Sequence, residues 1–458
     1  MTMKRLCCLH APLLALWMLA SPLPQGTPYI EDPHSKNFHP KGHDIDPALF
    51  FQNIHSDLAF WGRLAFQGTY DGFRIVDITE HGNPKLVIKF KCNGNQGDVS
   101  VWQHLLFRSI DQPQTTDTCD SEDMPQDVPG FEGIQIFDIS DPANPVFLKA
   151  VPVDCGSHTQ TLVPDLKNNR VLIYVSSWTS NFIGLSPFGN NCQPVHEKIP
   201  IVAVPLDNPQ AASVIGNMPL PGANHCHDIA VHLGVHRAVG ACNPYYNMVW
   251  DISDPANPVA LYKFSHPLVP YWHSASFTWD GRVMVMGWEP GGGVQPHCQA
   301  TSPDVEKSIF FFDTYTGVLL GTWVLQRPQS DTENCTIHNY NVVPLRGRYV
   351  LVHGSYQSGV SVVDFTNLTN AFEVGFDDPP PLVPAQLGGA WSAYWYNGFI
   401  YESDITKGLN VFKLTNKATA RAKKLDHLNP QTQEMVIEDE DEDDDHDDRR
   451  IRDHDVDG

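Results

Sequence analysis

One octapeptide occurs twice in this chain and constrains what the chain can fold into. Asp-Ile-Ser-Asp-Pro-Ala-Asn-Pro stands at 138–145 and again at 251–258. Alternating apolar residues precede each copy and an apolar run follows it, which is the pattern of two strands. Asp and Asn bond their own backbone in turns, and Pro fixes the bend and withholds a donor. The sequence therefore predicts two β-hairpins with the same turn.

Weaker copies of the hairpin extend the repeat along the chain, so that seven hairpins follow one another in phase. The weaker copies begin at Gly72, Pro200, Ile309, Gly359 and Gly408. Each unit can be laid out as four strands, which in the fifth unit are 272–279, 281–288, 307–313 and 317–325. Several short strands in each repeat are typical of a propeller. We therefore predict an all-β fold, a seven-bladed β-propeller of four-stranded antiparallel blades over residues 53–414.

The repeated unit resembles that of the LVIVD-repeat proteins, which reads Gly-Leu-x-Ile-x-Asp-x-Ser-Asp-Pro-x-x-Pro. The similarity covers residues 53–414 and is strongest in the units ending at Asp138 and Asp251. The resemblance implies a secreted or surface β-propeller, and it implies no particular chemistry.

The N-terminal part of the chain differs from the repeat region. Lys4-Arg5 and the apolar run 6–19 predict a secretory signal peptide over 1–24, with a retained anchor as the alternative. Residues 27–52 form a His- and Pro-rich lead-in without clear periodicity. We expect a protein that is secreted, extracellular or periplasmic, and not transmembrane after cleavage.

The C-terminal part, residues 415–458, is polar and then acidic, and we expect it to be disordered because it cannot bury a core. Its run 438–448 serves solubility or, alternatively, binds Ca²⁺ weakly through carboxylate oxygens. The net charge of −23 argues against nucleic acid as a partner. The seventh unit shows only three strands, so a strand from the lead-in or from 416–430 must complete it.

The chain has ten cysteines, and removal of the predicted signal peptide with Cys7 and Cys8 leaves eight, an even number. An even number in a secreted chain predicts disulfides. Cys226 and Cys242 lie symmetrically about Gly234, the expected turn of a hairpin, so they face each other across the ladder. Proximity along the chain gives the other three pairs, Cys92–Cys119, Cys155–Cys192 and Cys298–Cys335.

A histidine followed by a small polar residue recurs at the start of the first strand in five units. These histidines are His55, His158, His227, His273 and His338. The first strands start at the face where the long connections 111–131, 178–197 and 289–306 open, so we expect a ring of imidazoles at the channel mouth. Converging imidazoles make a transition-metal site, with Zn, Cu, Fe or Mn undetermined. Alternatively, the rings bond the blade backbone and serve only the architecture.

Other side chains near the same face extend this prediction. The carboxylates that we expect to bind the metal or to orient the rings are Asp228, Glu289, Glu402 and Asp404. The aromatic residues that suit stacking of a sugar or peptide are Trp178, Tyr271, Trp288, Tyr356, Trp391 and Trp395. Two function classes follow. One is a metal-dependent enzyme of oxidase or lyase type, and the other is a non-enzymatic extracellular scaffold that binds a glycan or protein through its loop face.

Overall fold

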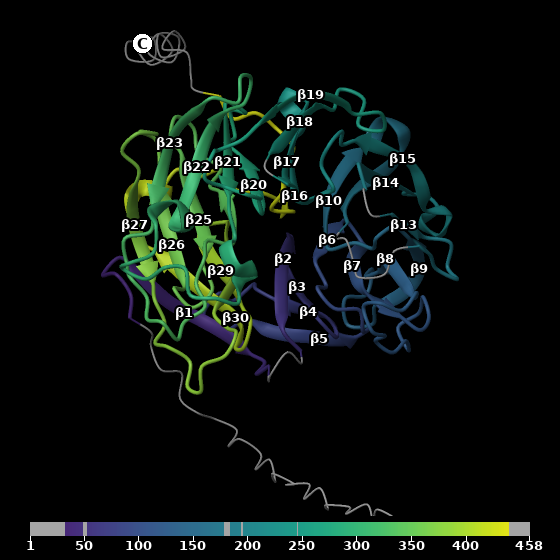
Figure 1. Cartoon of the computed structure of the whole chain (residues 1–458). Coiled ribbons are helices and arrows are strands. Elements are labelled where there is room, and N and C mark those ends of the chain that lie inside the picture. Colours follow the sequence, from purple (N-terminus) through teal and green to yellow (C-terminus); the bar gives the residue numbers. More distant parts are fainter. Residues whose placement is uncertain (1–32, 49–52, 178–183, 194–195, 245, 439–458) are drawn as a thin grey trace, which may run out of the picture. The chain divides into compact units, whose positions relative to one another are not determined.

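The computed structural model describes residues 33–48, 53–177, 184–193, 196–244 and 246–438, and Figure 1 shows their arrangement. All of them belong to one unit of the chain, residues 32–458. The predicted signal peptide and the acidic run from 439 onward lie outside the described residues. Within the described residues the chain forms strands and short 3-10 helices and no α-helix, as an all-β fold requires.

The two identical octapeptides form identical turns, as the sequence predicts. The Asp138 carboxylate accepts a hydrogen bond from the Ser140 amide at 2.8 Å, and that of Asp141 accepts one from the Ala143 amide at 3.0 Å. Asp251 and Asp254 make the matching bonds at 2.8 and 3.1 Å in the second copy. These side chains satisfy backbone donors that a tight turn leaves without partners, which fixes the hairpin.

Among the described residues, five four-stranded antiparallel meanders stand as separate blades, and two of them, the first and the fourth, each pair with one further short strand. The first blade has β2 (His55–Trp61), β3 (Leu64–Thr69), β4 (Gly72–Asp77) and β5 (Lys85–Lys91). The second has β6 (Val99–Trp102), β7 (Leu105–Gln114), β8 (Phe131–Asp138) and β9 (Val146–Pro152). The third has β10 (Thr159–Asp165), β11 (Arg170–Ser176), β14 (Lys198–Pro205) and β15 (Ser213–Pro219). The fourth has β16 (His225–His232), β17 (Arg237–Asn243), β18 (Asn247–Asp251) and β19 (Val259–Phe264). The fifth has β20 (Ser274–Phe277), β21 (Val283–Gly287), β22 (Ser308–Asp313) and β23 (Leu319–Val324).

The prediction of seven separate blades is wrong, because eight further strands form one eight-stranded sheet beside the five blades. Its order is β1-β30-β29-β28-β24-β25-β26-β27. The strands are β1 (Phe38–Ile45), β24 (Asn339–Val342), β25 (Val350–Gly354), β26 (Val360–Asp364), β27 (Phe372–Asp377), β28 (Ala390–Tyr396), β29 (Phe399–Asp404) and β30 (Gly408–Leu414).

Two antiparallel meanders make up this sheet, and parallel pairing of β24 with β28 joins them. Asn339 pairs with Ser392 and Tyr340 with Ala393. The amide of Asn341 extends the junction, because it donates to the Trp395 carbonyl at 3.0 Å and accepts from the Trp395 amide at 2.9 Å. Backbone groups that would otherwise lie unpaired between two blades are thereby satisfied.

The sheets pack face to face in a closed cycle, which is a β-propeller arrangement. Their first strands contact one another in the order β2, β6, β10, β16, β20, β24, β28 and again β2. The apolar cores lie between neighbouring sheets, since each cluster of buried side chains draws on two or more of them. Phe60 of the first blade stacks on Tyr396 of the eight-stranded sheet at 4.8 Å between ring centroids, and Phe311 of the fifth blade stacks on Phe365 at 4.6 Å.

The lead-in supplies the strand that completes the last unit. β1 pairs antiparallel with β30, from Phe38 opposite Leu414 to Ile45 opposite Gly408. Of the two sources that the sequence left open, the lead-in is therefore the one used.

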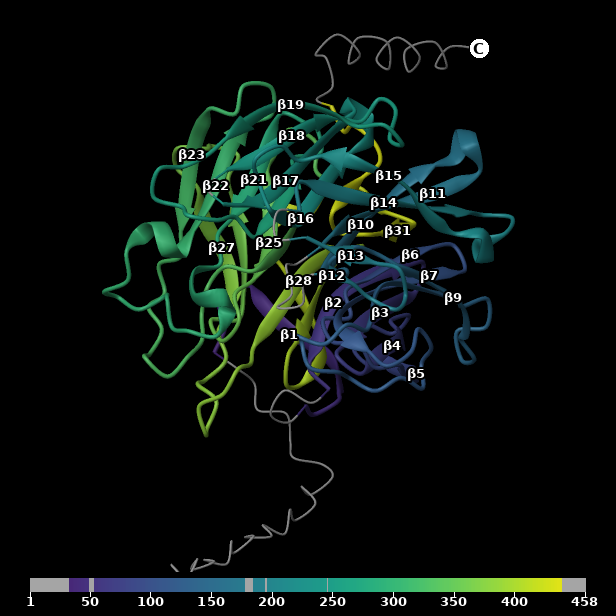
Figure 2. The same ribbon diagram turned by 45° about the vertical axis from the view of Figure 1, so that its right-hand side comes forward.

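The C-terminal segment (425–437) is ordered, and the prediction of disorder from 415 onward is wrong for this part. β31 (His427–Leu428) pairs with β2, and β32 (Thr432–Gln433) runs parallel to β16. The Asn429 side chain accepts from the Val101 amide at 2.8 Å and donates to the Val101 carbonyl at 2.9 Å. In Figures 1 and 2 this yellow segment lies beside the first strands of the blades. The C-terminal segment bonds backbone groups of those strands, a role that amino-acid composition does not predict.

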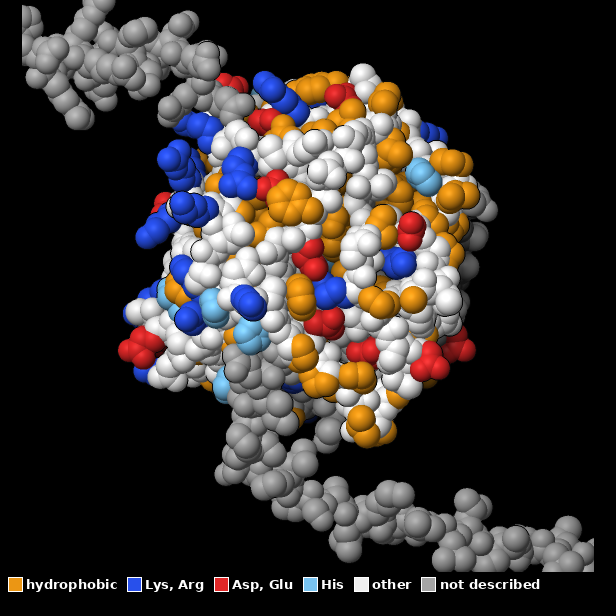
Figure 3. Space-filling model, turned by 90° about the vertical axis from the view of Figure 1, so that its left-hand side faces the viewer, with side chains coloured by type: hydrophobic (Ala, Val, Ile, Leu, Met, Phe, Trp, Pro, Cys, Tyr) orange, Lys and Arg blue, Asp and Glu red, His pale blue; other side chains and the backbone are white. Residues whose placement is uncertain are grey.

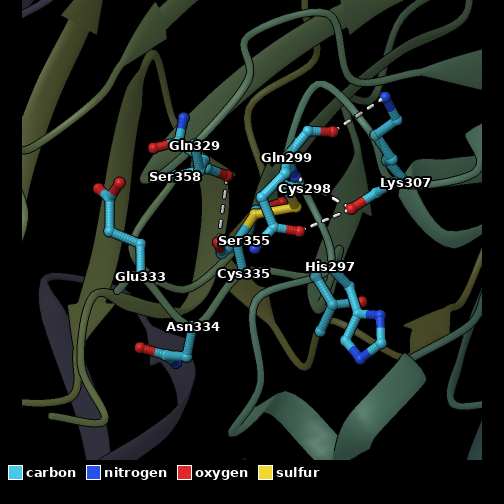
Figure 4. The surroundings of a disulfide bond; sticks show 12 residues. His297, Cys298, Gln299, Lys307, Gln329, Glu333, Asn334, Cys335, Ser355 and Ser358 are labelled. Atoms are coloured by element: carbon cyan, nitrogen blue, oxygen red, sulfur yellow. Dashed lines mark hydrogen bonds between the residues drawn. A yellow bond between two sulfur atoms is a disulfide. The ribbon is translucent and has the colours of Figure 1, made fainter. Parts of the chain in front are cut away.

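All four predicted disulfides are present, Cys92–Cys119, Cys155–Cys192, Cys226–Cys242 and Cys298–Cys335. Cys226 is paired with Cys242 in the β16–β17 ladder, as the symmetry about Gly234 indicates. Figure 4 shows the disulfide of Cys298 and Cys335, which ties the long connection after β21 to the segment before β24. Disulfides thus fix the long connections against the blades.

The remaining elements are short. β12 (Gly184–Leu185) pairs with β13 (Asn191–Cys192) in the connection between β11 and β14. The 3-10 helices are η1 (Leu166–Asn168), η2 (Pro209–Ala211), η3 (Leu233–Val235), η4 (Pro290–Gly293), η5 (Asp304–Lys307) and η6 (Lys417–Thr419). Among the residues described, no helix is long and apolar enough to cross a membrane. On the face drawn in Figure 3, Lys and Arg side chains gather on the left.

Candidate metal centre

Four of the five predicted histidines line one cavity of about 450 Å³. His158, His273 and His338 directly precede the first strands β10, β20 and β24, and His227 lies within β16. The ladder of β16 shifts register between Cys226 and Ile229, at the His-polar pair. A bulge of this kind re-aims side chains, so local geometry contributes to turning the ring toward the cavity.

The four imidazoles form a continuous row. The ring centroids are 4.5 Å apart for His158 and His227, 3.7 Å for His227 and His273, and 4.5 Å for His273 and His338. Figure 1 shows the four sheets of these residues following one another around the propeller. Residues that lie far apart in sequence thus converge because their units are adjacent in space.

Hydrogen-bond acceptors at Nδ1 orient three of the rings. His158 Nδ1 lies 2.6 Å from Asp111 Oδ2, and His227 Nδ1 lies 3.2 Å from Asp228 Oδ1. His338 Nδ1 donates to the backbone carbonyl of Trp391. An acceptor at Nδ1 holds the proton there in a neutral ring, which leaves the Nε2 lone pair available to a ligand.

The Nε2 ends of the rings converge on one another and on Glu289. His158 Nε2 is 2.9 Å from His227 Nε2. Glu289 reaches both of the other rings, with Oε2 3.5 Å from His273 Nε2 and Oε1 3.6 Å from His338 Nε2. Two nitrogens bound to one tetrahedral ion lie about 3.3 Å apart when each metal–nitrogen bond is about 2.0–2.1 Å. The separations observed are therefore close to those within a coordination sphere.

Two overlapping groups of three side chains could each hold a metal ion, with their donor atoms within 4.8 Å of one another. One group is His227, Asp228 and His273, and the other is His273, Glu289 and His338. Glu289 and His338 line the cavity, whereas Asp228 does not and contacts the Nδ1 of His227. The second group is therefore the better candidate for an ion that also meets an exogenous ligand.

Burial keeps the imidazoles of His227, His273 and His338 neutral. Loss of solvation lowers the pKa of His227 and of His273 well below the usual value, and neighbouring histidines lower both further. Burial also lowers the pKa of His338 to about 3, and it raises the pKa of Glu289 to about 7. Neutral imidazole is the form that binds a metal, so these histidines are ready ligands near neutral pH, whereas Glu289 has to lose its proton when a metal binds.

Three predicted residues lie away from this cavity. His55 is fully buried, with Nδ1 3.1 Å from the Ile405 carbonyl and Nε2 3.1 Å from Asp46 Oδ2. Glu402 accepts a hydrogen bond from the Asn410 amide at 2.8 Å. Asp404 accepts from the backbone amide of Thr406 at 2.8 Å. Glu402 and Asp404 are held by their own sheet or turn, whereas His55 is held by the turn after β29 and by the lead-in.

Some of the predicted aromatic residues line the cavity and others do not. Tyr271, Tyr356 and Trp391 line the cavity, whereas Trp288 and Trp395 are buried in apolar clusters of the sheets. Trp178 lies outside the described residues.

Sequence reasoning missed Tyr70, Gln96 and Asp111 at the site. Tyr70 and Gln96 line the cavity, and the Gln96 amide lies 3.0 Å from His158 Nε2. Asp111 holds the other nitrogen of His158. Gln96 lies between the glycines at 94 and 97, a spacing that marks a special backbone conformation and was a usable signal.

The fold and this site define a β-propeller with an LVIVD-type repeat and a cavity lined by His and Glu. Residues 130–152 match the LVIVD repeat, which confirms the resemblance drawn from the repeated turns. No curated protein matches the chain.

Many solved structures resemble this chain, at low sequence identity. A crystal structure of the computationally designed Ika8 protein is 13% identical, with a TM-score of 0.45 over 82% of this chain and 99% of that one. A crystal structure of the Mitotic Checkpoint Complex contains a chain that is 10% identical, with a TM-score of 0.48 over 89% of this chain and 100% of that one.

Proposed function

We propose that the cavity binds a divalent transition-metal ion through His273, His338 and Glu289. The observation that carries the proposal is that Glu289 reaches the Nε2 atoms of two histidines from different sheets, at 3.5 and 3.6 Å. Two imidazoles and a carboxylate form a ligand set typical of catalytic zinc and related ions. His227 and His158 continue the row beside this group and supply further nitrogen ligands.

The surroundings favour an ion that takes part in chemistry over one that only ties the fold together. The cavity of about 450 Å³ leaves space for a small molecule beside three protein ligands. Tyr356 donates a hydrogen bond from its phenol to Glu289 Oε1 at 2.5 Å, and its ring centroid lies 4.6 Å from that of His338. A metal held there would polarise a bound oxygen, and the Tyr356 phenol, which donates to Glu289, would lie beside it as a proton donor. We therefore propose a metal-dependent enzyme of oxidase or lyase type.

Four disulfides support a place of action in an oxidising compartment. We accordingly propose that the protein works outside the cytosol, secreted or in the periplasm. Binding without catalysis is the other candidate function, and the aromatic side chains Tyr271, Tyr356 and Trp391 in the cavity wall favour it, because aromatic faces stack on sugars or peptides.

Elemental analysis of the untagged protein, expressed with Zn, Cu, Fe and Mn present, tests the metal site. We expect about one tightly held ion per chain, and loss of most of it in His273→Ala, His338→Ala and Glu289→Gln, because removal of one of three ligands destroys the geometry as well as a bond. His55→Ala is the matched control, since it removes a histidine of the same sequence pattern whose contacts lie outside the cavity. Circular dichroism checks that each variant is folded.

Two results would overturn the proposal. One is a metal content near zero after expression with each of the four metals. The other is equal loss of metal in His55→Ala and His273→Ala with both proteins folded. If metal is bound, oxygen consumption reports an oxidase, and ultraviolet absorbance of a new conjugated double bond reports a lyase. Binding of a sugar or peptide without either signal would assign the scaffold function instead.

A further inference from the structure

A second hollow, the polar pocket, adjoins the metal cavity. It has a volume of about 400 Å³, and Tyr70 lines both hollows. Four residues with side-chain amides line the polar pocket, Asn53, Asn93, Asn95 and Gln112. Asn93 also donates to the Ser121 carbonyl, and Gln112 also bonds Met124 and Gln126. Amides both donate and accept hydrogen bonds. This wall therefore suits a ligand with many groups that also both donate and accept hydrogen bonds.

The loop between the first and second blades forms the wall shared by the two hollows. Asn95, Gln96 and Gly97 have positive φ angles of 58°, 42° and 66°, a conformation that non-glycine residues rarely adopt. The Asn95 side chain lines the polar pocket, and that of Gln96 lines the metal cavity and contacts His158. Backbone strain of this kind persists where the surroundings hold it and is concentrated at ligand sites.

Neighbouring contacts hold the strained loop in place. The backbone amide of Asn95 donates to the Tyr70 carbonyl at 3.0 Å, and Cys92 just before the loop is bonded to Cys119. A Cβ atom at Gly97 would lie 2.3 Å from the Thr69 carbonyl oxygen, so only glycine fits there. The loop is therefore a fixed part of the wall, formed before any ligand binds.

One polar atom of this wall lacks a partner. Asn95 Oδ1 is buried and has no hydrogen-bond partner among the described residues. A buried acceptor without a donor is unfavourable, and rotation of the Asn95 side chain would bring it to a hydroxyl group in the pocket. The charges of the pocket are Asp71, Asp123 and Lys91, with an excess of negative charge that disfavours anionic ligands.

We propose that the polar pocket binds an uncharged carbohydrate whose adjoining sugar unit extends past Tyr70 into the metal cavity. Vicinal hydroxyls match the amides and carboxylates of the pocket. Tyr70 and Trp391 meet edge to face at 6.2 Å between ring centroids, and both line the metal cavity, where their rings offer a surface for sugar stacking. The assignment of the metal cavity as the reacting end rests on the proposed function, whereas sugar binding in the polar pocket does not.

Calorimetric titration of the full chain with neutral oligosaccharides (cello-, xylo-, malto- and chito-oligosaccharides) tests the proposal, with oligouronates as the anionic comparison. Asn95→Gly keeps the positive φ and removes only the amide, and we expect it to weaken binding about tenfold, as loss of a buried hydrogen bond does. Asp71→Asn removes a charge at nearly constant shape and should relax the discrimination against oligouronates. The matched control is Asn169→Gly, an exposed asparagine with φ of 50° in another blade.

The same variants separate this proposal from the metal proposal. His273→Ala should lose metal and retain sugar binding, whereas Asn95→Gly should retain metal and lose sugar affinity. Absence of saturable binding to every neutral oligosaccharide overturns the carbohydrate assignment, as does tighter binding of oligouronates. Equal affinities of Asn95→Gly and Asn169→Gly overturn the placement in the polar pocket. None of these results alters the metal content by which the metal centre is judged.

Discussion

Glu132, at the start of β8, is a buried carboxyl group that forms no ion pair with a cation within the described residues. Its side chain is 1% exposed, and its Oε1 atom has no hydrogen-bond partner there. Burial raises the pKa of Glu132 from 4.5 to about 8, and the nearby Asp111 contributes to the rise. The folded protein therefore keeps this carboxyl protonated at a pH where the unfolded chain has released the proton.

Stability should fall with rising pH because of this residue. Between pH 4.5 and about 8 the folded state binds a proton that the unfolded state lacks, so the free energy of unfolding decreases through that interval and levels off above it. Glu132→Gln removes the effect, and its advantage over the natural protein should grow to the order of 5 kcal/mol above the interval. Urea unfolding over a pH series measures it, with exposed Glu122→Gln as control. Parallel pH profiles of the natural protein and Glu132→Gln would contradict the assignment.

Residue patterns predicted much of the candidate site and missed what depends on packing. His158, His227, His273 and His338 were found because the repeat places them at equivalent positions of adjacent units. His55 has the same pattern, but Asp46 of the lead-in lies against its ring. No local sequence pattern predicts such a contact, because it joins segments that become neighbours only when the propeller closes.

At the scale of elements, the disulfide between β16 and β17 closes a small loop. Cys226 and Cys242 are separated by 16 residues. By loop-closure entropy, its removal in Cys226→Ala/Cys242→Ala should lower the free energy of unfolding by about 3 kcal/mol. Cys298→Ala/Cys335→Ala is the matched comparison, because the same atoms are removed from a loop of 37 residues and the loss should be about 0.7 kcal/mol greater. Chemical unfolding measures both, and losses below about 1 kcal/mol would contradict the entropic account.

Hairpins were predictable from sequence, and the grouping of hairpins into sheets was not. Turn residues and alternating apolar positions are local, and the octapeptide turns formed as expected. The junction of β24 with β28 depends on Asn341 meeting the backbone of Trp395, across 54 residues. The C-terminal segment looked like solvated chain because its side chains are polar, yet those side chains bond buried backbone groups of other blades.

For the whole molecule, the C-terminal segment acts as part of the folded unit. Truncation after Lys424 removes β31, β32 and the two bonds of Asn429 to Val101. We expect Tm to fall by roughly 5–10 °C, since several buried backbone groups lose their partners. Truncation after Glu438 keeps every described contact and is the control. Scanning calorimetry compares the two, and equal Tm values would show that the segment adds nothing to stability.

The pairing of β1 with β30 has a consequence for how the protein is made. Phe38 faces Leu414, so the two partners are 414 − 38 = 376 residues apart in the chain. A ribosome that adds roughly 5–20 residues per second needs about 20–75 s to synthesise the stretch between them. Throughout that time β1 has no strand to pair with, and the nascent chain carries an extended segment with unsatisfied backbone groups. Completion of the last sheet therefore has to wait until β30 has been synthesised.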